Sequence, residues 1–251
     1  MHEKRWQTYD MTVNSLPQKI RYNPDTVEGL FLPLLRRLTE MQRAAARRIL
    51  VFLAAPPATG KSTLLQFLEE LTRTHAELTP VQALGMDGFH YPNNYLAAHT
   101  ILRDGVETPL KSIKGAPETF DVALLAEKLR AAKKGVTAFP VYDRRIHDPR
   151  SDALKVDAAI LLIEGNWLLL DEEPWRDLRA LADYTLRIDV SSALLRDRLI
   201  GRKVQGGLSE GEATAFYEAS DAANVRRFAA HAGAADEVWR MEADGDFVRM
   251  Q

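Results

Sequence analysis

A glycine-lysine-serine triplet between two apolar segments is the first place in this chain where residue types and spacing could do chemistry. Gly60, Lys61 and Ser62 follow the apolar run 48–55, "RILVFLAA", and open the helical pattern 61–75. Backbone N–H groups of such a loop and of the helix N-terminus can surround phosphate oxygens. Lys61 would reach the β- and γ-phosphates of a nucleotide, and the Ser62 hydroxyl would ligate Mg²⁺. The triplet therefore predicts a phosphate-binding loop.

The loop departs from the common pattern G-x-x-x-x-G-K-[ST] at its first position. Ala55 stands where the pattern has glycine, and Ala58 occupies another position that is often glycine. Glycine is needed only where φ is positive or a Cβ would clash, and Pro56 and Pro57 stiffen the loop instead. The alternative to a phosphate-binding loop is that the glycine-lysine-serine triplet stands at a helix start by chance. The residues expected to contact ATP in this loop are Pro57, Ala58, Thr59, Gly60, Lys61, Ser62 and Thr63.

Two carboxylates stand at the ends of strand-like segments. Asp87 ends the segment 81–87, "VQALGMD", and Glu164 lies at the end of 158–165, "AAILLIEG". Asp87 could accept the proton of an attacking hydroxyl, and Glu164 could bind Mg²⁺ or polarise the nucleophile. Taken singly, an Asp before glycine is typical of a turn, and a strand-end Glu is usually solvated. Beside a phosphate loop, the pair predicts a phosphoryl-transfer site with Lys61, Asp87 and Glu164 as catalytic residues.

Strand-like segments alternate with helical ones along the chain. The expected strands are 48–55, 81–87, 136–143, 158–165 and 184–190, with an edge strand or hairpin within 236–250. The expected helices are 27–48, 61–75, 121–134, 192–204 and 210–232, with an irregular stretch over 88–120. This alternation predicts an α/β fold, a mostly parallel sheet with helices on both faces. Residues 1–48 are expected to form an N-terminal helical extension.

Composition excludes several classes of protein. The chain of 251 residues has a formal net charge of −2, which gives no electrostatic case for nucleic-acid or membrane partners. It contains no cysteine, which excludes disulfides and thiolate-metal sites. No apolar run approaches a membrane span, and the N-terminus does not read as a signal peptide. We expect a cytoplasmic protein with a small-molecule partner, and the sequence leaves room for a homodimer.

Six motifs in order carry a resemblance to a known superfamily. They are "PPATGKST", "MDGFHYPN", "KGAPETFD", "PVYDRRIHD", "LLIEGNWLL" and "LLRDRLIGRK", within residues 49–230. The chain resembles the P-loop small-molecule kinases of the uridine kinase, phosphoribulokinase and bacterial pantothenate kinase superfamily. It looks most like the branch described as nucleoside/nucleotide kinase-like or fructose-transport-system-kinase-like. The resemblance implies a P-loop NTPase fold, a kinase domain over 49–251 with an Arg-rich lid at about 191–210, and the cofactors ATP and Mg²⁺.

The resemblance also implies roles for single residues. Asp87 becomes the catalytic base and Lys61 the phosphate clamp, while Ser62 and Glu164 become magnesium-side residues. Of the lid arginines, Arg198 and Arg202 are expected to contact ATP in preference to Arg196. The alternative is that the lid arginines form only a solvated basic face of their helix. The expected substrate residues are His90, Tyr91, Tyr142, Arg144, His147 and Asn224.

The motifs disagree on the substrate. Tyr142 and His147 match the positions that contact the nucleobase in uridine kinases, whereas Arg144 replaces a substrate-binding His of pantothenate kinases. Arg144 and Arg145 would suit an anionic substrate by pairing with a carboxylate or phosphate. Further candidates around the pocket are Lys111, Lys114 and Asp221.

We therefore expect an ATP-dependent kinase that phosphorylates a hydroxyl of a sugar, nucleoside or pantothenate-like metabolite by direct in-line transfer. Two alternatives remain from the sequence. One is an ATP-hydrolysing switch or assembly ATPase, and the other is a nucleotide-binding protein without transferase activity.

Overall fold

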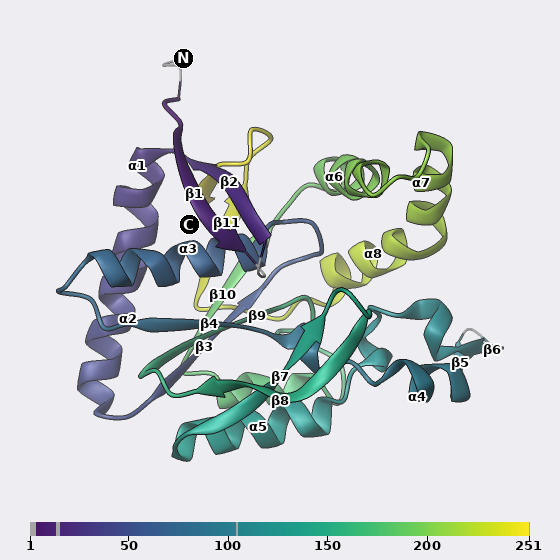
Figure 1. Ribbon diagram of the computed structural model, residues 1–251, viewed down its shortest axis with the longest axis horizontal. Coiled ribbons are helices and arrows are strands. Elements are labelled where there is room, and N and C mark those ends of the chain that lie inside the picture. The colour runs from purple at the N-terminus through teal and green to yellow at the C-terminus, as the bar shows by residue number, and fades with distance from the viewer. Residues whose placement is uncertain (1–3, 14–15, 104, 251) are drawn as a thin grey trace.

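A six-stranded sheet forms the centre of the computed structural model, which describes residues 4–13, 16–103 and 105–250 (Figure 1). The strand order is β12-β11-β10-β3-β9-β4, and every neighbouring pair is parallel except β11 with β12. The strands are β3 (Ile49–Ala54), β4 (Val81–Gly85), β9 (Ile160–Gly165), β10 (Tyr184–Asp189), β11 (Glu237–Met241) and β12 (Phe247–Arg249). The expected C-terminal edge hairpin is confirmed as β11 and β12.

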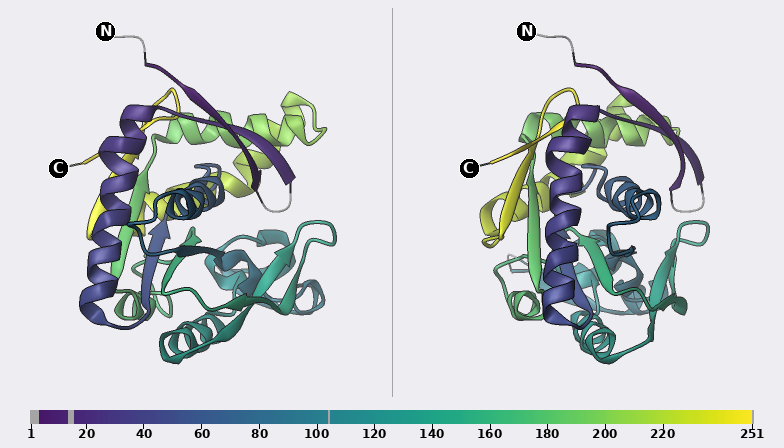
Figure 2. Two further views of the ribbon diagram at one scale, coloured as in Figure 1. Left: turned by 60° about the vertical axis from the view of Figure 1, so that its left-hand side comes forward. Right: turned by 90° about the vertical axis from the view of Figure 1, so that its left-hand side faces the viewer.

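Helices cover both faces of this sheet, as the alternating sequence predicts (Figure 2). Because side chains alternate along a strand, Ile49, Val51 and Leu53 of β3 share one core cluster with α2 (Leu32–Ala45) and α3 (Lys61–Thr74). Their neighbours in β3 face the opposite cluster, with α5 (Val122–Lys134). The Asp121 side chain accepts a hydrogen bond from the N–H of Leu124 and so caps the N-terminus of α5. The mostly parallel α/β sheet with two helical layers is therefore confirmed.

The expected strand over 136–143 is present but does not belong to the central sheet. It is β7 (Thr137–Asp143), and it pairs antiparallel with β8 (Asp148–Val156), a strand that the sequence did not predict. Pro140 lies at the irregularity in their register, between Phe139 and Val141. A proline cannot donate to a strand ladder, so it is confined to edges and bulges. The strand expected over 136–143 is thus confirmed as a strand, but it lies in a separate two-stranded sheet.

The first 48 residues are not helical throughout. The strands β1 (Gln7–Val13) and β2 (Leu16–Tyr22) form an antiparallel hairpin. The helix begins after it, with α1 (Pro24–Thr26), a π-helical segment (Val27–Phe31) and α2. The helical pattern of the sequence thus applies only to the second part of this region. The hairpin was not predicted.

The stretch over 88–120 contains more regular structure than expected. It includes a 3₁₀ turn (Met86–Phe89), α4 (Asn93–Ala98), the hairpin β5 (Thr100–Arg103) and β6 (Val106–Pro109), and two further 3₁₀ turns (Leu110–Ile113 and Pro117–Thr119). A last 3₁₀ segment, Arg176–Leu181, precedes β10.

Three consecutive helices follow β10 and stand over one edge of the sheet (Figure 1). They are α6 (Ser192–Gln205), α7 (Glu210–Phe216) and α8 (Ala222–His231). The predicted helix over 210–232 is interrupted by a π-helical segment, Tyr217–Asp221. No helix in the described part of the chain is long and apolar enough to cross a membrane.

Gly88 holds the turn after β4 against β7. A Cβ at this position would collide with the backbone carbonyl of Pro140. Any side chain here would therefore push the Met86–Phe89 turn, which carries Asp87, away from β7.

We expect Gly88→Ala to lower the free energy of unfolding by about 1–3 kcal/mol, as overpacking of a rigid contact does. Urea denaturation followed by circular dichroism measures this. Gly211→Ala is the matched control, because no atom lies within 4 Å of the added Cβ in α7. Alanine in a helix is favoured over glycine, so the control should be neutral or stabilising. Equal effects of both substitutions would contradict the proposed contact.

Candidate active site

The site is built where three neighbouring parallel strands end. Glu164 of β9 lies opposite Leu53 of β3 on one side and Gly85 of β4 on the other. The phosphate loop follows β3 directly, and Asp87 follows β4 by two residues. The strand register therefore brings the loop and both predicted carboxylates to one cavity of about 1130 Å³.

The loop keeps its conformation without the first glycine. Ala55 is fully buried, and it is not among the described residues with positive φ, so a glycine is not required there. Ala58, in contrast, has a φ of 64°, in the left-handed region that costs an alanine about 1–2 kcal/mol. Its carbonyl accepts a hydrogen bond of 2.7 Å from Nε of Arg198. Gly60, with a φ of 82°, precedes α3.

Lys61 lies buried at the start of α3 and folds back over the loop. Its Nζ donates to the carbonyl of Pro56 at 3.0 Å and to Oδ1 of Asn166 at 2.7 Å. Burial lowers the pKa of Lys61, an effect that the nearby carboxylates of Glu164 and Asp87 oppose. A phosphate group would supply the anionic partner that this ammonium lacks within hydrogen-bonding distance.

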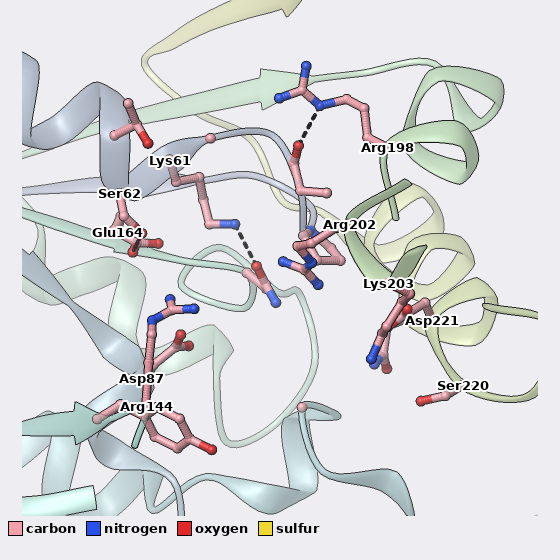
Figure 3. A pocket seen from close by; sticks show the side chains of 18 of the residues that line it. Lys61, Ser62, Asp87, Arg144, Glu164, Arg198, Arg202, Lys203, Ser220 and Asp221 are labelled. Atoms are coloured by element: carbon pink, nitrogen blue, oxygen red, sulfur yellow. Dashed lines mark hydrogen bonds between the residues drawn. The ribbon is translucent and has the colours of Figure 1, made fainter. Parts of the chain in front are cut away.

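Ser62 and Glu164 lie next to each other in the wall of the cavity (Figure 3). The Ser62 hydroxyl donates to Oε1 of Glu164 at 2.6 Å. Burial raises the pKa of Glu164, and the charge of Asp87 adds to this, whereas the Lys61 ammonium opposes it. A hydroxyl and a carboxylate are the hard oxygen ligands that Mg²⁺ takes together with substrate phosphates, so this pair fits the expected metal position. The described residues hold no cluster of three or more His, Asp or Glu that could bind a metal without such phosphates.

Asp87 and Arg144 line the same cavity next to Glu164 (Figure 3). No described residue donates a hydrogen bond to the Asp87 carboxylate, which leaves its oxygens available to a ligand. Figure 3 shows the Arg144 guanidinium directed toward Asp87 and Glu164. Arg144 makes no ion pair or hydrogen bond with the described part of the chain. Its positive charge lowers the pKa of Glu164, but only as a lesser contribution.

The helix α6 brings two of its arginines to the cavity, as predicted. Arg198 and Arg202 both line it, four residues apart on one helix face. Burial lowers the pKa of Arg198, and the charge of Arg202 contributes to the lowered pKa of Lys61. Arg196 points elsewhere, over the ring of Tyr217 at 5.8 Å.

The predicted substrate residues separate into two groups. His90, Tyr142, Arg144 and Asn224 line the cavity, together with Lys114 and Asp221. Burial lowers the pKa of His90, and its Nδ1 lies 2.9 Å from the carbonyl of Asp87.

Tyr91 and His147 do not line the cavity. Tyr91 stacks on Tyr95 with ring centroids 4.3 Å apart, and His147 is exposed, with its carbonyl accepting a hydrogen bond from Lys114. The structure thus leaves these two predicted substrate residues outside the site. Lys111 and Arg145 also lie outside it, and Arg145 pairs with Asp143 at 3.0 Å.

Sequence reasoning missed Asn166, which holds the Lys61 ammonium. Its only signal was its place two residues after the strand-end Glu164, in "EGN". It also missed Val13 and Gln18 of the N-terminal hairpin, which reach the cavity. Thr59, predicted at ATP, has its hydroxyl bonded to the carbonyl of Pro56 at 3.1 Å and does not line the main cavity.

Comparison with known proteins shows which proteins this chain is similar to. No family model matches the chain. It is 43% identical over 239 residues to "Uncharacterized protein YggC" of Escherichia coli, covering 95% of this chain and 97% of that protein. It is 33% identical over 188 residues to "Putative uridine kinase C227.14" of Schizosaccharomyces pombe, covering 71% and 77% of the two chains.

A solved structure gives the same relationship in three dimensions. The "putative fructose transport system kinase" from Silicibacter sp. TM1040 superposes with a TM-score of 0.70 at 34% identity, covering 77% of this chain and 90% of that one. The loop, the strand-end carboxylates and these relatives lead to one conclusion: the chain belongs to the P-loop kinase superfamily of uridine kinase, phosphoribulokinase and pantothenate kinase.

Proposed function

We propose that this protein transfers the γ-phosphoryl group of ATP directly to a hydroxyl of a small metabolite. The observation that carries the proposal is the Asp87 carboxylate, which has no protein donor and faces the cavity that Lys61 lines. A switch ATPase needs the loop but no second group of this kind. A base with free oxygens that shares a cavity with a phosphate clamp suits an acceptor hydroxyl placed beside the γ-phosphate.

The chain's own residues supply positioning and charge in this reaction. Asp87 accepts the hydroxyl proton as the oxygen attacks the γ-phosphorus in line with the departing ADP oxygen. Lys61 exchanges Asn166 for the phosphate oxygens, and Arg198 and Arg202 lie where charge develops during transfer. Ser62 and Glu164 would hold Mg²⁺, which, when bound, neutralises charge on the β- and γ-phosphates.

The test is to follow ADP formation with and without a panel of sugars, nucleosides, pantothenate and sugar acids. Acceptor-dependent turnover supports the kinase, and turnover without any acceptor would favour the switch ATPase. Binding of ATP without turnover would favour the nucleotide-binding protein.

Asp87→Asn keeps the shape of the side chain but removes the base. We expect ATP affinity to stay within about twofold and kcat to fall by roughly 10²–10⁴, the usual contribution of general-base catalysis. Coupled ADP release and isothermal titration measure the two quantities. An unchanged kcat would remove Asp87 from the mechanism.

Arg144 selects, in this proposal, for an acceptor that carries an anionic group. Its unpaired guanidinium lies beside the carboxylate that would receive the hydroxyl proton, and guanidinium groups bind carboxylate and phosphate through paired hydrogen bonds. Lys114, which has only carbonyl oxygens as hydrogen-bond partners, lines the same cavity.

We expect Arg144→Ala to raise KM for an anionic acceptor by about 10–100-fold, since a hydrogen bond to a charged group contributes about 1.5–3 kcal/mol. The KM for ATP should change little. Arg145→Ala is the control, because the Arg145 side chain is 83% exposed and pairs with Asp143. If Arg144→Ala leaves acceptor KM unchanged, or if only neutral acceptors are used, the assignment is wrong.

A further inference from the structure

A second cavity of about 250 Å³ adjoins the phosphate loop, and Asp87 is not among the residues that line it. It lies between the N-terminal hairpin and the turn that joins β11 to β12. Gly60, Thr63 and Arg198 line both this cavity and the main one. A ligand with its phosphates in the loop could therefore extend past these three residues into the second cavity.

The lining of this cavity suits a flat heterocycle with polar edges. The hairpin side supplies Trp6, Ile20 and Tyr22, and the opposite side supplies Met241 and Phe247. Binding sites for small molecules are mostly apolar and aromatic, with a few polar groups that set orientation. Here the polar groups are Arg21, Asp244, Thr59 and Thr63. The Cζ atom of Arg21 lies over the Trp6 ring, 5.7 Å from the ring centroid. This cation–π contact links the two side chains in the cavity wall.

Contacts with the domain hold the hairpin in this position. The ring of Tyr9 packs edge-on against Phe67 of α3 with centroids 4.7 Å apart, and that of Tyr22 lies 4.5 Å from the same ring. These aromatic contacts fix the hairpin against the helix that begins at the phosphate loop. Figure 2 shows the hairpin passing beside α3 in both views.

The two walls of the cavity are also joined to each other. Lys4, just before the hairpin, forms ion pairs with Asp244 at 2.9 Å and with Asp246 at 3.0 Å. Asp246, only 2% exposed, also accepts hydrogen bonds from Asn23 and Thr26. A wall held in place before binding loses little entropy when a ligand enters.

We propose that Trp6, which directly precedes the N-terminal hairpin, and Arg21 of its second strand form one wall of the nucleobase site. Residues that precede β3 by 43 and 28 positions then contribute directly to nucleotide binding. The inference rests on the proposed function, because it requires the nucleotide phosphates to lie in the loop at Gly60 and Lys61.

The chain offers a direct optical test. Three of the four tryptophans, Trp167, Trp175 and Trp239, are at most 2% exposed, whereas Trp6 is half-buried beside the cavity. Magnesium ADP should therefore change the tryptophan emission of the full-length protein. Magnesium tripolyphosphate, which has no base, should bind the loop without this change. Trp6→Phe should abolish the change while leaving ADP affinity within a few-fold, because the aromatic wall remains.

The affinities of the variants for ADP and for tripolyphosphate then distinguish contacts to the base from contacts to the phosphates. We expect Trp6→Ala and Arg21→Ala each to weaken ADP binding by about 10-fold, in line with the 1–3 kcal/mol measured for aromatic stacking on bases. Tripolyphosphate affinity should stay unchanged in both. Lys19→Ala is the matched control, since Lys19 is on the same hairpin with its side chain 79% exposed and does not line the cavity.

The outcomes are distinguishable. Unchanged ADP affinity in folded Trp6→Ala and Arg21→Ala proteins, with no emission change in the wild type, would overturn the hairpin's role and leave the kinase proposal intact. Equal weakening of ADP and tripolyphosphate would also overturn it, because the effect would then not concern the base. Failure of the wild type to bind either ligand would overturn the proposed function itself.

Discussion

The parallel register of β3, β9 and β4 is the constraint on which the rest of the site depends. It sets Glu164 opposite Leu53 and Gly85, and so places the starts of two loops on either side of one carboxylate. The 2.6 Å hydrogen bond from Ser62 to Glu164 then joins residues 102 positions apart. A slip of one residue in β9 would turn Glu164 to the other face of the sheet, because side chains alternate along a strand. The site would lose the carboxylate that we propose holds Mg²⁺, without any change in sequence.

Positively and negatively charged side chains lie close together in the main cavity. Lys61 and Glu164 are both 9% exposed, and Asp87 and Arg144 line the same cavity. Burying a charge is costly unless it is paired, and the pairing here is incomplete. Lys61 is held by a carbonyl and an amide oxygen, and Asp87 has no donor within the described chain. Charged side chains that lack such partners in the protein are characteristic of sites where a bound ligand supplies them.

The N-terminal hairpin connects this chemistry to a region that the motifs do not reach. It packs on α3 through Tyr9 and Tyr22 and is tied to the C-terminal turn through Lys4. The loop, the hairpin and the turn before β12 therefore behave as one framework around the phosphate position. The left-handed Ala58 adds to this framework, because its strained backbone is held by Arg198 of α6. Movement of α6 would change both the loop and the cavity that it lines.

The sequence by itself determined the features that are local in the chain: the glycine-lysine-serine loop, the buried strands, and Asp87 and Glu164 at strand ends. Each follows from apolar runs and from residues within a few positions of one another. Tertiary structure decided which distant side chains share the cavity. It brought in Asn166, Val13 and Gln18, and it left out Tyr91 and His147, whose motifs suggested substrate contact. The physical reason is that a side chain's direction at a hairpin or turn is set by nonlocal packing, such as Gly88 against Pro140, and not by its spacing along the chain.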